Sequence, residues 1–151
     1  QGDALMPALF ALGQHDALAE AQSMLLPGES LHAFLDDIYI VTSRPRAREV
    51  FDLVTECIQR HANVATNMGK TRAWSKAGGA PPPGIAELGD DVWRADRPVD
   101  ENGLVILGSP LGTPEFCERH AFICAAFCRP VFRLSTRAFM IPAYSTCSVV
   151  C

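Results

Sequence analysis

The pattern of apolar residues in the first third of the chain predicts a helix followed by a pair of short strands. Residues 3–26 have the composition of a helix that ends at the sequence LPGES. Residues 31–35 and 38–42 are short apolar runs, which predict two strands. Between them, Asp36 and Asp37 predict a tight turn, because short acidic side chains hydrogen-bond to their own backbone in turns.

A second helix is predicted directly after the strands. Ser43 is a suitable N-cap, and Pro45 is tolerated in a first helical turn. Apolar residues then recur at helical spacing, at Ala47, Val50, Phe51, Val54 and Ile58. This spacing places them on one face, so we expect the helix to pack on a core.

The middle of the chain has weaker patterns. Val64 and residues 72–74 are candidate short strands around a turn at Gly69. The sequence AGGAPPPG at residues 77–84 predicts a flexible or polyproline-type linker, because proline lacks the donor that regular ladders need.

The last third begins with GLVILGSPLG, which predicts a buried strand ended by a Gly-Ser-Pro turn. A helix is expected from about residue 114 to 128, and the remainder has no clear period. The whole pattern predicts an α+β fold, with helices packed on one face of a small antiparallel sheet.

The composition is that of a globular chain with an uneven charge distribution. The 151 residues are 48% hydrophobic with a formal net charge of −4, which fits one domain and no generally basic surface. Residues 1–42 carry six acids and no Lys or Arg, whereas residues 43–80 carry seven bases and three acids. Such blocks can hold a cation beside a polyanion, or can be two solvated faces.

The ends of the sequence and its hydropathy also lead to expectations. No apolar run approaches the roughly 18 residues of a membrane span, so no membrane association is expected. The sequence begins with Gln and has no basic signal region, which suggests a piece of a longer or processed protein.

The adjacent acids Asp36 and Asp37 are the main chemical candidates. At the tip of a hairpin, their oxygens suit a hard cation such as Mg²⁺ or Mn²⁺. A two-metal phosphoryl-transfer site would need at least one further carboxylate from elsewhere. An ordinary acidic hairpin turn is the alternative.

Four segments together resemble the palm domain of reverse transcriptases of the non-LTR retroelement type. In chain order they are QGDALMPALFAL (1–12), AFLDDIYIVT (33–42), NMGKTRAW (67–74) and VILGSPLG (105–112). The resemblance covers residues 1–116 and implies a partial palm. Residues 117–151 are then expected to be a degenerate or truncated thumb.

The resemblance implies a polymerase reaction centred on three residues. Asp36 matches the family's catalytic metal ligand and Asp37 the second acid, which hold Mg²⁺ for attack of a primer 3′-hydroxyl on a nucleotide α-phosphate. Lys70 matches the lysine near the leaving pyrophosphate, where an ammonium neutralises or protonates it.

Further residues are implied to line the cleft. Gln1 and Gly2 match the nucleotide and template side, and Phe34 takes the aromatic position where the primer end packs. Leu107 and Gly108 match the turn of the primer grip. The implied partners are an RNA template, a DNA primer and deoxynucleotides. The resemblance implies a location in the nucleus or cytoplasm, and it leaves the oligomeric state open.

The resemblance also predicts that the chain alone is inactive. The family's other catalytic aspartate belongs to a strand before the QG helix, which this sequence does not contain. Without it, Mg²⁺ or Mn²⁺ could not be held as a pair. The parent protein would be an RNA-directed DNA polymerase, and the alternative is a non-catalytic retroelement remnant.

Two other features suggest different ligands. Cys124 and Cys128, and Cys147 and Cys151, have spacings found in structural zinc sites, so a small zinc-binding interaction domain is a further alternative. Three arginines begin the second helix, at positions 44, 46 and 48. The helix dipole disfavours cations there, which suggests a phosphate partner or a solvated helix end.

Overall fold

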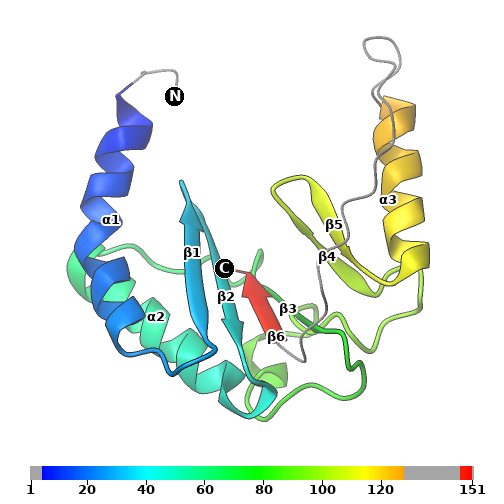
Figure 1. Cartoon of the computed structure of the whole chain (residues 1–151), viewed down its shortest axis with the longest axis horizontal. Helices are drawn as coiled ribbons and strands as arrows, with labels where there is room; N and C mark the ends of the chain where they lie inside the picture. The colour runs from blue at the N-terminus through cyan, green and yellow to red at the C-terminus, as the bar shows by residue number, and fades with distance from the viewer. Residues whose placement is uncertain (1–4, 128–146, 151) are drawn as a thin grey trace.

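The structure is a computed structural model that describes residues 5–127 and 147–150, and it has an α+β fold (Figure 1). The helices are α1 (Met6–Ser23), α2 (Ala47–Ala62) and α3 (Pro114–Phe127), with short 3-10 turns η1 (Arg44–Arg46) and η2 (Ala86–Leu88). The strands are β1 (Ser30–Phe34), β2 (Asp37–Thr42), β3 (Arg72–Ser75), β4 (Gly103–Ile106), β5 (Ser109–Gly112) and β6 (Cys147–Val150).

The described strands form two antiparallel sheets. The larger sheet has the order β1-β2-β6-β3, so the strand from the end of the chain lies between β2 and β3. Val150 is opposite both Tyr39 on β2 and Arg72 on β3. The smaller sheet is the hairpin β4–β5, which stands beside the larger one with its turn leaning toward β2 (Figure 1).

The core lies between the larger sheet and the helices α1 and α2. The five apolar residues that predict the second helix face are all buried on α2, which confirms that prediction. Ile38 and Ile40 of β2 are buried in the same cluster, and α1 contributes Ala17 and Ala21. The small side chains of Ala17 and Ala21 lie one helical turn apart and let α1 approach α2 closely. Full burial of a residue such as Ile40 contributes about 2 kcal/mol to the free energy of unfolding.

The second helix begins differently from the prediction. Ser43 makes no capping hydrogen bond, and the prolyl segment forms the 3-10 turn η1 before α2 starts at Ala47. Glu49 and the last-turn residues Arg60 and His61 complement the helix dipole. Val64 is not in a strand, whereas the strand predicted at residues 72–74 is β3.

Residues 77–84 have no regular structure, as predicted, but side chains from other segments donate hydrogen bonds to their carbonyl groups. Arg44 donates to the carbonyl oxygens of Gly78 at 2.6 Å and Ala80 at 2.5 Å, and Arg48 donates to that of Gly84 at 2.9 Å. The indole N–H of Trp93 donates to the Gly79 carbonyl at 2.8 Å. Because this segment cannot join a sheet ladder, long side chains from neighbouring elements satisfy its acceptors.

The predicted strand at residues 103–112 is a complete hairpin, and its turn lies earlier than Gly-Ser-Pro. Leu107 and Gly108 connect β4 to β5 with φ values of +49° and +80°. Positive φ at both central residues is the geometry of a tight type I′ hairpin turn, which glycine adopts without strain. The boundary expected between residues 116 and 117 falls within α3, which packs on β5 through Phe116.

No helix within the described part of the chain is both long and apolar enough to cross a membrane.

Candidate functional site

The acidic hairpin joins β1 and β2 by a two-residue turn made of Leu35 and Asp36. Asp37 is the first residue of β2 and lies opposite Phe34, so the turn is one residue earlier than the predicted Asp36 and Asp37 pair. Leu35 has a φ of +54°, the left-handed conformation that such a short turn demands. Asp36, in the turn, and Asp37, the first residue of β2, therefore both lie at the tip of the hairpin.

Asp36 and Asp37 both line a cleft of about 240 Å³. Lys70 lines the same cleft, so the structure brings together the three residues that the resemblance implies as catalytic. The remaining walls come from β2, α1, α2 and the loop that follows α2, and include Phe10, Gln14, Ile38, Val54, Thr55, Ile58 and Asn67. An apolar cleft with a few convergent polar groups is the usual form of a small-ligand site.

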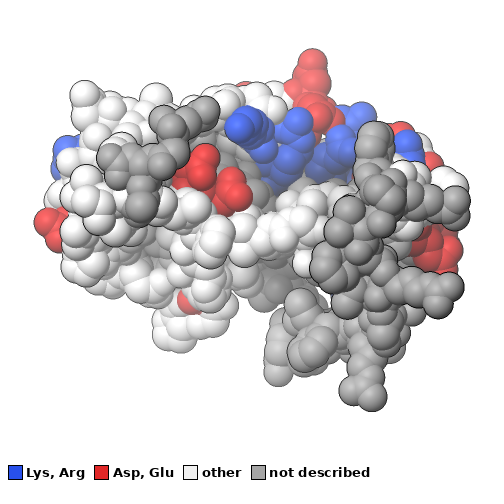
Figure 2. Space-filling model, turned by 90° about the horizontal axis from the view of Figure 1, so that it is seen from above, with Lys and Arg blue, Asp and Glu red and all other residues white. Residues whose placement is uncertain are grey.

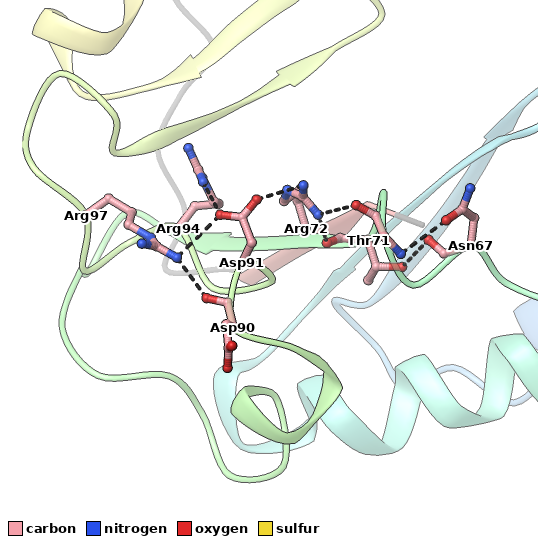
Figure 3. A network of polar contacts seen from close by, with 8 residues as sticks. Asn67, Thr71, Arg72, Asp90, Asp91, Arg94 and Arg97 are labelled. Carbon is pink, nitrogen blue, oxygen red and sulfur yellow. Dashed lines mark hydrogen bonds and ion pairs between the residues drawn. The ribbon is translucent and has the colours of Figure 1, made fainter.

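Lys70 reaches the cleft from a turn that fixes its backbone. The N–H groups of Lys70 and Thr71 donate to the Asn67 carbonyl oxygen at 3.0 and 3.2 Å, and the Asn67 side chain accepts from Gly69 N–H at 3.1 Å. Figure 3 shows the contact between Thr71 and Asn67. Within the described residues, the Lys70 ammonium has no hydrogen bond or ion pair. A fixed backbone with a free ammonium leaves this lysine available to an anion.

Tyr39 connects the acidic hairpin to the turn between β4 and β5. Its hydroxyl donates to Asp37 Oδ2 at 3.2 Å and lies within hydrogen-bonding reach of the Leu107 backbone N–H. Burial, the charge of Asp37 and the hydrogen bond to Asp37 together raise the pKa of Tyr39 above its ordinary value, although the Leu107 N–H acts in the opposite direction. The turn of Leu107 and Gly108 therefore lies on the same side of the molecule as the acid pair.

The other residues implied by the resemblance are only partly placed. Phe34 is exposed beside the turn, next to the acids, and Leu107 is exposed at its own hairpin tip. Gln1 and Gly2 lie outside the described residues. Sequence reasoning missed Tyr39 and Gln14. Tyr39 lies within the segment 33–42 but was given no role there, and its place two residues after Asp37 on the predicted strand was the available signal; Gln14 lies outside the four segments.

The candidate metal ligands form a pair rather than a full set. Asp36 and Asp37 are the two carboxylates of the cleft, and no group of three or more His, Cys, Asp or Glu residues within the described ranges is arranged to hold a metal ion. Of the cysteines considered for zinc, Cys124 is exposed with its Sγ 3.4 Å from His120 Nε2. Cys128 and Cys151 lie outside the described residues, and Cys147 is described by its place in β6 alone.

The three arginines that open the second helix already have protein partners. Arg44 holds two carbonyls of residues 77–84 and stacks over the Trp93 ring at 5.4 Å. Arg46 pairs with Glu29 and Glu49, and the third arginine pairs with Asp52. These contacts explain the cations at a helix start, so the inference of a phosphate partner at this position loses its basis.

No protein-family model, no curated protein and no solved structure matches this chain.

Proposed function

We propose that this chain is part of the palm of an RNA-directed DNA polymerase of the reverse transcriptase type. The observation that carries the proposal is the meeting of Asp36, Asp37 and Lys70 at one cleft from segments more than 30 residues apart in the sequence. Two acids beside a free ammonium match the groups that nucleotidyl transfer uses. Carboxylates hold the metal that binds the phosphate oxygens, and a cation neutralises the leaving pyrophosphate.

The proposed reaction joins a primer 3′-hydroxyl to the α-phosphate of a deoxynucleotide on an RNA template. Asp36 and Asp37 would bind Mg²⁺, which supplies charge neutralisation and lowers the pKa of the attacking hydroxyl when bound. Lys70 would neutralise or protonate the leaving pyrophosphate. A third carboxylate from elsewhere in the parent protein is required, so we expect the 151-residue chain alone to give no primer extension.

The part of the site present in this chain is testable by metal binding. Mn²⁺ titration followed by paramagnetic NMR line broadening should broaden the amide signals of Asp36 and Asp37 first, with a dissociation constant on the order of 10⁻³ M. The Asp36→Asn, Asp37→Asn double variant should lose this broadening. Asp96→Asn is the matched control, because Asp96 is an exposed carboxylate without a described partner, and it should behave like the parent chain.

Two results would contradict the proposal. Broadening that is equal in the double variant and the control would remove the metal site. Robust incorporation by the 151-residue chain on a primer–template would show that the site needs no third carboxylate.

A further inference from the structure

A second cluster of basic residues gathers where the sequence shows no motif. Arg72 is on β3, while Arg94 and Arg97 lie in the segment after the buried Trp93, more than 20 residues later. The fold brings these segments together through a parallel bridge between Ala73 and Trp93. Figure 2 shows Lys and Arg side chains gathered on one face of the molecule, beside acidic side chains.

All three arginines converge on one carboxylate, that of Asp91 (Figure 3). Arg72 Nη2 lies 2.8 Å from Asp91 Oδ2, and Arg94 Nη1 and Arg97 Nη2 lie 2.5 and 3.3 Å from Oδ1. One negative charge cannot balance three guanidinium groups, so this cluster has two uncompensated positive charges. Bringing like charges together in this way costs free energy unless an anion is added.

The cluster retains unused hydrogen-bond donors. Arg94 has a described partner at Nη1 alone, which leaves Nε and Nη2 free. The Nε of Arg97 is buried without any hydrogen-bond partner, the one such side-chain atom among the described residues. Buried donors without acceptors are rare in folded proteins. Arg97 does not line the groove between β3 and the β4–β5 hairpin, so, of these free donors, a ligand in that groove can reach those of Arg94.

Arg72 and Arg94 line a groove of about 320 Å³ between β3 and the β4–β5 hairpin. Lys70 lines this groove as well as the cleft of Asp36 and Asp37, so the two depressions meet at one lysine. Asp91 is the one carboxylate among the residues that line the groove, against three cations.

We infer that this groove binds the phosphate backbone of a nucleic-acid strand, with Lys70 and Arg94 as the main contacts. Arginine and lysine donors with excess positive charge suit phosphodiester oxygens. Because Lys70 borders both the groove and the acidic cleft, an extended strand could contact both, whereas a single phosphate group would occupy the groove alone. The inference rests on the proposed function for the identity of the cleft, but its contacts are independent of Asp36 and Asp37.

The two lysines of the chain provide a matched test of the groove. A fluorescently labelled 15-nucleotide single strand is titrated with the full chain in EDTA, over a series of salt concentrations, and anisotropy is recorded. Lys70→Gln should weaken binding and reduce the slope of log K against log salt by about 0.7, the value for one phosphate contact of a single strand. Lys76→Gln, which changes an exposed lysine without a described partner, should leave both unchanged.

Arg94→Gln should have the same effect as Lys70→Gln, and Arg94→Lys should recover part of it. Arg60→Gln is the control for an arginine, because Arg60 is on α2 and pairs with Glu20 and Glu56. Since the Lys70 ammonium makes no hydrogen bond or ion pair with the described residues, its variant tests the groove even if Arg94→Gln misfolds. Equal binding by Lys70→Gln and Lys76→Gln overturns the inference.

Two further measurements distinguish strand binding in the groove from an isolated phosphate site and from the proposed polymerase site. Inorganic tripolyphosphate should compete more weakly than unlabelled strand; equal competition would overturn a strand site in favour of an isolated phosphate site. The Asp36→Asn, Asp37→Asn variant should still bind the strand in EDTA. Strand binding without Mn²⁺ binding would therefore sustain the groove while refuting the proposed polymerase site, and the reverse result would do the opposite.

Discussion

Replacement of Glu29 by glutamine is expected to destabilise the fold strongly, although Glu29 lies in a loop end rather than in the apolar core. Its side chain is 5% exposed and accepts four hydrogen bonds. The donors are Thr42 Oγ1 at 2.6 Å, Arg46 Nε at 2.9 Å and Nη2 at 3.4 Å, and Leu26 N–H at 2.9 Å. This carboxylate therefore joins the end of the α1–β1 loop, the end of β2 and the start of α2.

The size of the expected loss in the free energy of unfolding follows from the burial of Glu29 and from the contacts that remain after its substitution. Removing one partner of a buried ion pair typically costs about 3–5 kcal/mol. Arg46 is partly solvated and keeps its contact with Glu49, and glutamine retains one acceptor oxygen, so we expect about 2–3 kcal/mol for Glu29→Gln. Glu49→Gln alters the other partner of Arg46, but Glu49 is 65% exposed, and about 0.5 kcal/mol or less is expected.

Urea unfolding followed by tryptophan fluorescence measures both variants. With an m value of about 1.5 kcal/mol/M, Glu29→Gln should lower the midpoint by about 1.3–2 M. Burial alone would raise the pKa of Glu29, but its hydrogen bonds from Arg46, Thr42 and Leu26 N–H lower it below 4.5. The stabilisation is therefore complete above pH 4.5 and is lost as the pH falls through the depressed pKa.

The difference between the parent chain and Glu29→Gln should accordingly be full at pH 7 and shrink in acid. Equal midpoints for the Glu29 and Glu49 variants would refute the reasoning from burial. A difference that stays constant down to pH 3 would refute the role assigned to the charge.

Three further changes test the local geometry by thermal unfolding. Gly103→Ala should destabilise the fold, because its Cβ would lie 2.7 Å from the Leu111 carbonyl oxygen and overlap the Phe116 ring. Gly13→Ala, in open space within α1, should stabilise it by up to about 1 kcal/mol. A change of the same sign in both variants would contradict this account. Leu107→Asn should stabilise by about 0.5–1 kcal/mol, because asparagine tolerates the left-handed conformation in a hairpin turn, and no gain over Leu107→Ala would count against turn strain.

Local patterns in the sequence predicted the elements whose formation depends on near neighbours. Val50 and Val54 lie on the buried face of α2 because a period of 3.6 residues places them there in any helix. The β1–β2 hairpin was equally predictable, since two apolar runs joined by two acids leave few alternatives. The turn was displaced by one residue because strand pairing extends to Phe34 and Asp37, and a two-residue turn then has to use Leu35.

Pairing between distant segments was beyond any local pattern. The strand β6 (Cys147–Val150) lies between β2 and β3, and neither its sequence nor its spacing indicated a partner. Non-local strand pairing depends on closing a long loop and on which edges remain free, and both are properties of the whole chain.

The two charged clusters show the same division. The sequence placed three arginines together at residues 44–48, yet the fold gives them carboxylates and carbonyl groups as partners. It left Arg72 about 20 residues from Asp91 and Arg94, yet the fold joins them into a groove beside Lys70. The sequence by itself determined which residues are charged and which helix face is buried, because both follow from composition and local period. Only the tertiary structure decided which charges meet, because electrostatic interaction depends on distance in space rather than along the chain.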